Sequence, residues 1–325
     1  MDMIVCGLFR VLRAKVFPLH QARYFHSETR LLASDKSLLV KLRRQTGYSF
    51  VKCKQALDKF NNDLKQAEAW LHDEAQKQGW SKASKLKGRK TAEGLIGLLQ
   101  EGNCAVMVEV NCETDFVARN ANFQQLVQQV ALGTMMHYQG KQETLSTYIK
   151  SFLGADELAQ LKTSSDGTSL SDQVALTIGK LGENMTLRRA AWVAVPPNFF
   201  IGSYVHGATP SNLPSSSTVV FGRYGALVIC QTSEESSRSS ILELGRRLGQ
   251  HVVGMSPLSV GSLQDEPGGD TETKMLAQPF LLDPNISMGE YLYPRGVAVL
   301  DFLRFECGEE LEMANAEPAR HSAEN

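Results

Sequence analysis

Nucleophiles, general bases and potential metal ligands are scattered along the 325 residues of this chain. The sequence contains no Gly-rich phosphate loop, no nucleophile elbow and no zinc-protease helix motif, whose fixed spacings bring reactive groups together. No two histidines among His72, His137, His206 and His251 have the spacing of metal ligands. We therefore expect a protein that is not an enzyme and that holds no metal or cofactor of its own.

One segment places an acidic and an aromatic side chain at a predicted strand-to-helix corner. A strand is expected to end at Val110 and a helix to begin after Thr114, which leaves Asp115 and Phe116 at the corner. Thr114 is a good N-cap and Asp115 complements the helix dipole, so the pattern has an ordinary structural explanation. The same pair would also serve as a wedge, because a ring fills a partner's pocket while a carboxylate addresses backbone N–H groups at a helix end.

The elements around this corner are expected to be strands grouped beside helices. Residues 95–99 and 105–110 have the pattern of a β-hairpin, and helical spacing follows from Phe116 to Val130. Further strands are expected at 188–195, 200–205, 226–232 and 297–305, with helices from Ser171 and over 238–253. Because these strands do not alternate strictly with helices, the sequence predicts an α+β fold with antiparallel sheets.

Residues 34–75 have the pattern of a small three-helix domain. An apolar stripe through Leu42 marks the first helix, and Ser49 is a good N-cap for the second. Asp63 and Gln66 form a capping box at the start of the third. A module with such a small core usually binds a partner or is tethered to a larger domain.

The next segment, residues 76–92, has the composition of a basic, polar linker. Its cations crowd together at Lys82, Lys85, Lys87, Arg89 and Lys90. Such a run suits nucleic-acid phosphates, but no aromatic residue is interleaved among the charges as a stacking surface requires. We favour a solvated linker and expect no nucleic-acid partner. The alternative, an RNA-binding protein of the mitochondrial matrix, predicts strongly salt-dependent affinity.

The N-terminal residues 1–33 have the features of a mitochondrial transit peptide. No acidic residue lies between Asp2 and Glu28, while arginines recur among apolar residues. Basic residues interrupt the apolar run that a secretory signal needs, and no run reaches the roughly 18 residues of a membrane span. We expect import into the mitochondrion and no membrane association.

The remaining composition is that of a folded protein with an acidic end. Hydrophobic residues make up 42% of the chain and charged residues 21%, which argues against disorder throughout. Residues 311–325 are expected to form a disordered acidic tail. Six cysteines occur without a CxxC pair, so we expect reduced, buried thiols rather than disulfides or a zinc site.

Taken together, the motifs resemble those of the elongation factor Ts family, in its mitochondrial form. The first family motif is LRRQTGYSFVKCKQAL at 42–57, and the second is EVNCETDFVAR at 109–119. Shorter matches follow in the family's order, with LGEN at 181–184, YVHG at 204–207, QPF at 278–280 and RFECGE at 304–309. They cover nearly everything from 35 to 310, and the chain is identified as a member of that family.

The resemblance implies a nucleotide exchange factor for elongation factor Tu of the mitochondrial matrix. Such a factor binds the GDP-bound GTPase, loosens Mg²⁺ and the phosphates, and lets GTP replace GDP, while binding no nucleotide itself. It also implies that residues 34–75 resemble a ubiquitin-associated (UBA) domain. A core N-subdomain over 93–197 and a core C-subdomain over 198–310 would follow.

By motif position, the resemblance also implies the residues that contact the partner. Phe116 would wedge between two helices of the partner's GTPase domain, Asp115 would hold a helix end, and both lie in the motif Thr114–Val117. The other implied contacts are Arg43, Phe50 and Val51 on the three-helix domain and Leu181, Gly182 and His206 on the core.

Two departures from the family pattern limit this transfer. Bacterial members often carry a coiled-coil insertion, whereas residues 255–277 are too short and too rich in Pro and Gly for heptads. Leu181 stands where the family commonly has Ile. An alternative from another class is a ubiquitin-binding adaptor built on the UBA-like domain, but an adaptor would have no use for the Thr114–Val117 corner.

Overall fold

The computed structural model describes residues 28–139, 145–163, 167–208, 219–232, 238–269 and 271–310. These residues form two compact units, and the boundary falls after Leu71, inside helix α3 (Leu64–Leu86). The predicted transit peptide up to residue 27 and the predicted tail at 311–325 lie outside the described residues.

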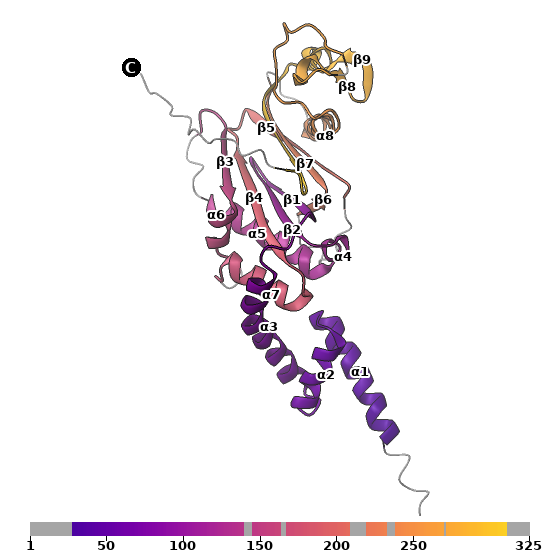
Figure 1. The fold of residues 1–325 in the computed structure, drawn as a ribbon. Helices are drawn as coiled ribbons and strands as arrows, with labels where there is room; N and C mark the ends of the chain where they lie inside the picture. Colours follow the sequence, from indigo (N-terminus) through magenta and orange to yellow (C-terminus); the bar gives the residue numbers. More distant parts are fainter. Residues whose placement is uncertain are drawn as a thin grey trace, which may run out of the picture. The chain divides into compact units, whose positions relative to one another are not determined.

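The first unit is helical, as expected (Figure 1). It contains α1 (Glu28–Thr46), α2 (Phe50–Lys59) and the start of α3, which is consistent with the UBA-like prediction. Ser49 caps α2 by accepting a hydrogen bond from the Lys52 amide. At α3, Asp63 Oδ1 accepts from the Gln66 amide at 3.0 Å. The Gln66 side chain bonds the Asp63 carboxylate rather than its backbone N–H, so the capping box is only partly formed.

The predicted linker over 76–92 is wrong for residues 76–86, which form the second half of α3. This half packs on α7 (Leu170–Leu181) with two glycines at the crossing. A Cβ added to Gly79 would lie 2.3 Å from the Ala175 carbonyl oxygen, and one added to Gly179 would lie 2.5 Å from that of Ala75. Lys82 Nζ donates to the Gly179 carbonyl at 3.3 Å. This close helix contact stabilises a helix that the polar sequence alone does not indicate.

The layers of the second unit are stacked in the order helix, sheet, sheet, helix (Figure 1). The five-stranded sheet has the order β3-β4-β2-β1-β6 and the three-stranded sheet the order β10-β7-β5, with every pairing antiparallel. The first sheet contains β1 (Glu93–Glu101), β2 (Cys104–Cys112), β3 (Ile149–Gly154), β4 (Met185–Ala194) and β6 (Val220–Gly222). The second contains β5 (Phe199–His206), β7 (Tyr224–Thr232) and β10 (Val297–Glu306). The α+β prediction with antiparallel sheets is confirmed.

Helices cover the outer face of each sheet. On the five-stranded sheet lie α4 (Asp115–Ala118), α5 (Ala121–His137), α6 (Ala155–Gln160) and α7. On the three-stranded sheet lie α8 (Arg238–Met255) and a small lobe of η1 (Met275–Ala277), β8 (Pro279–Phe280), β9 (Asp283–Ser287), α9 (Met288–Leu292) and η2 (Tyr293–Arg295). Within the described residues, no helix is long and apolar enough to cross a membrane.

Several elements differ from the sequence prediction. No strand or helix is predicted between 140 and 170, yet β3 and α6 lie in the described part of this stretch. The helical stretch from Phe116 is interrupted, because Asn120 caps a new helix by accepting from the Asn122 amide at 2.9 Å. Strand β6 belongs to the first sheet although it follows residue 198, so the two predicted subdomains share a sheet as well as the core between the sheets.

A buried carboxylate joins the two sheets. Glu109 on β2 is fully buried, and its oxygens accept hydrogen bonds from the Arg189 Nε at 2.7 Å and the Gly308 amide at 2.8 Å. Asn111 and Arg188 add bonds of 3.1 and 3.3 Å. The β2–β4 register shifts by one residue beside Glu109, and this bulge lets both arginines reach the same carboxylate.

A buried histidine ties the small lobe to α8. His251 Nδ1 accepts from the Leu281 amide at 3.3 Å, so Nε2 carries the proton and donates to Gln278 Oε1 at 3.1 Å. The Gln278 amide group in turn donates to the carbonyls of Met255 and Glu272. The QPF motif therefore begins with a residue that satisfies several buried polar groups.

The packing of α8 on β5 generates the first prediction. A Cβ added to Gly202 would lie 2.7 Å from the Gly245 Cα, so Gly202→Ala must push helix and sheet apart. We expect it to lower the free energy of unfolding by about 1–3 kcal/mol, measured by urea denaturation. Gly269→Ala is the control, because its Cβ meets no atom within 4 Å. Equal stability of the two variants would contradict this packing.

The second prediction concerns acid stability. Burial lowers the pKa of His251 from 6.5 to about 4, so the unfolded chain binds this proton more tightly than the folded protein. The contribution of His251 to the free energy of unfolding is complete above pH 6.5. It falls by up to about 3 kcal/mol as the pH drops from about 6.5 to 4. Urea unfolding at several pH values should show a shallower decline in His251→Asn than in the wild type. Parallel curves would rule out this role for His251.

Candidate partner-binding site

The predicted corner is one short helical turn, in which the Phe116 side chain faces solvent and the Val117 side chain faces the core. Thr114 caps α4, and its hydroxyl accepts from the Val117 amide at 3.4 Å, as the sequence predicts. Phe116 is 81% exposed, whereas Val117 is buried in the core beneath the five-stranded sheet. The buried neighbour anchors the turn, so the phenyl ring is displayed on a fixed support.

Asp115 lies beside the ring in a weak surface ion pair. Its carboxylate is 3.0 Å from the guanidinium of Arg119, and both side chains are about half exposed or more. Exposed pairs of this kind contribute roughly 0.2–1 kcal/mol, so the pairing is easily exchanged for another donor. The arrangement provides an apolar ring and an addressable carboxylate side by side.

Two glutamates connect this corner to the end of α7. Glu183 accepts from Thr114 twice, from the hydroxyl at 2.7 Å and from the amide at 3.1 Å. Glu113 accepts from the Asn184 amide at 2.7 Å. The structure thus brings the TDFV and LGEN motifs together although they are far apart in sequence. The sequence analysis did not single out Glu113, Glu183 or Asn184, although each lies inside a quoted motif.

Leu181 and Gly182 end α7 next to these contacts. Gly182 has a left-handed backbone with φ of 86°, and its amide donates to the Ile178 carbonyl at 2.8 Å. A Cβ there would meet no atom within 4 Å, so the conformation rather than lack of space favours glycine. Leu181 is partly buried against the core. Of the two, Gly182 is exposed.

His206 lies at the end of β5 and is exposed. Its Nδ1 is 3.1 Å from the Tyr204 hydroxyl, and its carbonyl accepts from the Arg223 amide. Arg223 also forms an ion pair with Glu93, whose strand position is opposite Cys112 at the end of β2. His206 is therefore linked to the end of the sheet that carries the corner, without direct hydrogen bonding to Asp115 or Phe116 among the contacts described.

The first unit carries a separate exposed cluster. The guanidinium of Arg43 lies 4.1 Å from the centroid of the Phe50 ring, a cation–π contact at the start of α2. Phe50 is 45% exposed and Val51 67% exposed. The structure therefore brings Arg43 and Phe50 together and leaves Val51, the next residue of α2, exposed.

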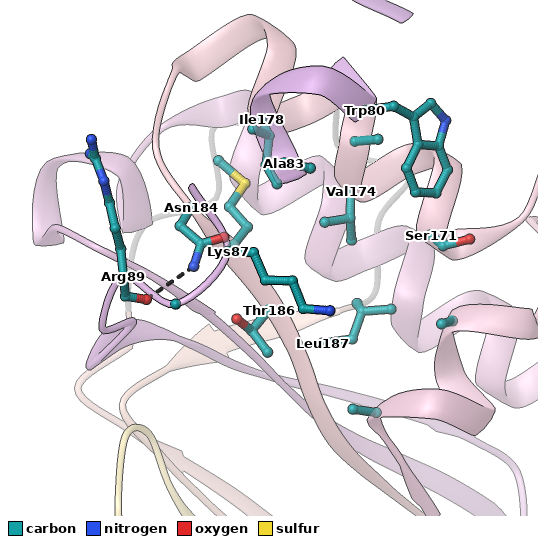
Figure 2. A pocket seen from close by; sticks show the side chains of 15 residues that line it. Trp80, Ala83, Lys87, Arg89, Ser171, Val174, Ile178, Asn184, Thr186 and Leu187 are labelled. Carbon is teal, nitrogen blue, oxygen red and sulfur yellow. Dashed lines mark hydrogen bonds between the residues drawn. The ribbon is translucent and has the colours of Figure 1, made fainter. Parts of the chain in front are cut away.

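An open groove of about 350 Å³ in the second unit lies beside the LGEN motif (Figure 2). Trp80, Val174 and Leu187 contribute to its largely apolar lining, and Figure 2 shows the Asn184 side chain bonded to the Arg89 carbonyl next to it. Nothing in the lining forms a nucleophile and base pair. No group of three or more His, Cys, Asp or Glu that could hold a metal occurs in the part of the chain that the structure describes.

The described cysteines offer no reactive thiolate. All five are buried, as the sequence predicts. Burial raises the pKa of the Cys112 and Cys307 thiols to about 12, so both stay protonated near neutral pH.

Comparison with known proteins gives two family matches. The model of the family described as "Elongation factor Ts, mitochondrial, N-terminal" matches residues 22–81, and that described as "Elongation factor TS" matches residues 113–266. The first range includes the Arg43 and Phe50 cluster, and the second includes the corner at Asp115 and Phe116.

Curated proteins named "Elongation factor Ts, mitochondrial" are similar over most of their length. The Xenopus laevis protein is 62% identical over 314 residues, which is 97% of this chain and 100% of the relative. The Homo sapiens protein is 66% identical over 286 residues, 88% of this chain and 87% of the relative. The Aedes aegypti protein is 43% identical over 283 residues, 86% of this chain and 90% of the relative.

Proposed function

The chain belongs to the mitochondrial elongation factor Ts family and is a translation elongation factor of the mitochondrion, and from this premise we propose that it exchanges GDP for GTP on elongation factor Tu. It would act in the matrix on the GDP-bound partner. The factor itself binds neither nucleotide nor Mg²⁺ and performs no covalent chemistry, because the partner holds both. The ubiquitin-binding adaptor is not favoured, since the family match extends over the core.

The observation that carries the proposal is the exposed ring of Phe116 on an anchored turn. Burying a phenylalanine side chain in a partner's pocket stabilises a complex by roughly 1.5–3 kcal/mol. Asp115 adds a carboxylate that suits the positive end of a partner helix, where unpaired backbone N–H groups point outward. Together they would separate two helices of the partner's GTPase domain.

Exchange then follows from a coupling free energy. If the wedge binds the open, nucleotide-free partner better than the GDP-bound partner, it weakens GDP binding by the same factor. The displaced helices no longer hold Mg²⁺ and the phosphates in place, so GDP leaves and GTP enters. Leu181, Gly182 and His206 would extend the contact surface of the core.

The Arg43, Phe50 and Val51 cluster would form a second contact with the GTPase domain, near its phosphate-binding region. Two contacts on one chain raise the effective concentration of each for the same partner. The first unit is therefore expected to contribute to affinity more than to the exchange step itself.

The third prediction tests the wedge. With the double variant Asp115→Ala and Phe116→Ala, a fluorescent GDP analogue should leave mitochondrial elongation factor Tu about thirtyfold more slowly than with the wild-type factor, because truncating a central aromatic contact costs about 2 kcal/mol. Thermal melting should be nearly unchanged, since both side chains lie at the surface. Release at the wild-type rate by this folded double variant would refute the wedge.

The fourth prediction tests the separation of the units. A chain that begins at His72 should still melt cooperatively, because the second half of α3 and its contact with α7 are kept. It should bind the partner more weakly, because the first unit is missing. A shorter chain that begins after Gly88 loses the Gly79 and Gly179 crossing and should have a lower melting temperature. Unchanged affinity of the His72 chain in a titration would contradict a binding role for the first unit.

A further inference from the structure

We propose that Glu183 is a positioning residue for exchange, which holds the Asp115 and Phe116 corner in the orientation that meets the partner. This inference rests on the proposed function, because it concerns how the same wedge is presented. Glu183 does not itself need to touch the partner. It acts through Thr114, the residue on which α4 begins.

Helix α4 is too short to hold its own direction. It has 4 residues, and a single helical turn fixes several backbone dihedrals for very few hydrogen bonds. The chain bends again immediately afterwards, where Asn120 caps α5. The direction of the Phe116 ring therefore depends on contacts with other parts of the unit.

Besides the packing of Val117 and Ala118 in the core, the polar contacts come from Glu183 and the segment that contains it. Both Glu183 oxygens are engaged by Thr114, so the N-cap residue is gripped at its side chain and at its backbone. We call these two Glu183–Thr114 hydrogen bonds the brace. The Thr114 hydroxyl donates to Glu183 and also accepts from the Val117 amide, so the brace is connected to the first turn of α4. Hydrogen bonds to a charged group are stronger than those between neutral groups.

A reciprocal contact keeps this brace from rotating. Glu113, directly before Thr114, accepts from the Asn184 amide, directly after Glu183. Arg89 lies against both partners, since its guanidinium is 3.5 Å from Glu113 and its carbonyl accepts from Asn184 Nδ2 at 3.0 Å. Figure 2 shows this last bond beside the groove. Two segments held at two adjacent residues cannot pivot about a single bond.

Gly182 acquires a structural role from this arrangement. Its left-handed backbone ends α7 and redirects the chain immediately before Glu183. The LGEN motif then contributes to exchange by carrying the brace, in addition to any direct contact made by Leu181 or Gly182. A substitution at Gly182 would disturb the corner without touching Phe116.

The test is a set of full-length variants assayed on mitochondrial elongation factor Tu loaded with a fluorescent GDP analogue. Glu183→Ala should lower kcat/KM for GDP release about tenfold. Glu183→Gln keeps one acceptor oxygen for the Thr114 amide and offers an NH2 group from which the Thr114 hydroxyl can accept, so it should recover part of the loss. Glu183→Asp keeps the charge but cannot reach both Thr114 groups, and should give an intermediate loss. It also carries the test if the alanine variant fails to fold.

A matched control removes the same kind of bond from another strand-to-helix corner. Glu157 accepts from the Gly154 amide at 2.8 Å where β3 leads into α6. Glu157→Ala should leave exchange unchanged. Hydrogen–deuterium exchange should become faster at residues 114–118 in Glu183→Ala and remain at the wild-type rate there in Glu157→Ala.

A double-mutant cycle separates positioning from general destabilisation. If Glu183 acts through the ring, Glu183→Ala should cause no further loss in a Phe116→Ala background. Additive losses, or a Glu183→Ala variant with wild-type kcat/KM, would overturn the positioning role while leaving the wedge intact. A Phe116→Ala variant with wild-type exchange would instead overturn the proposed function.

Discussion

The buried carboxylate of Glu109 is the interaction on which the arrangement of the second unit depends. An unpaired charge at a fully buried position would cost several kcal/mol, so the fold must supply donors to it. It does so from three directions, with Asn111 on the same strand, Arg188 and Arg189 on β4, and the Gly308 amide beyond β10. The centroid of the Phe305 ring lies 3.9 Å from the Arg189 guanidinium, which adds a cation–π contact to this cluster. The two sheets are therefore held together at this end by a polar cluster as well as by apolar packing.

The candidate contact surface is built directly on that fixed end. Strand β2 continues past Glu109 to its end at Cys112, and Glu113 and Thr114 follow directly, with hydrogen-bond partners that lie after α7. An exchange factor needs no reactive group of its own, because its work is the difference between its affinities for two states of a partner. Contact side chains that are already ordered lose less conformational entropy on binding, so more of the contact energy is available to favour one state of the partner. A rigid corner is thus the physical requirement of the proposed function.

The two units place different demands on the chain. The first has a small core and an exposed Arg43 and Phe50 cluster, which suits a module that adds affinity. The second combines three hydrophobic clusters with buried polar contacts at Glu109 and His251. Helix α3 contains the boundary between them, and its two halves belong to different units. A polar composition in this helix therefore reflects its surface, and not the flexibility of a linker.

Local sequence determined those features that depend on near neighbours. The caps at Ser49 and Thr114, the first hairpin and the outward position of Phe116 follow from side-chain chemistry and periodicity within a few residues. Tertiary structure decided what depends on distant partners. The second half of α3 needs the α7 backbone against Gly79, the edge strand β3 needs β4, and the brace at Glu183 needs a threonine 69 positions away. Such contacts form only when the fold brings distant segments together, so they cannot be predicted from one stretch of sequence.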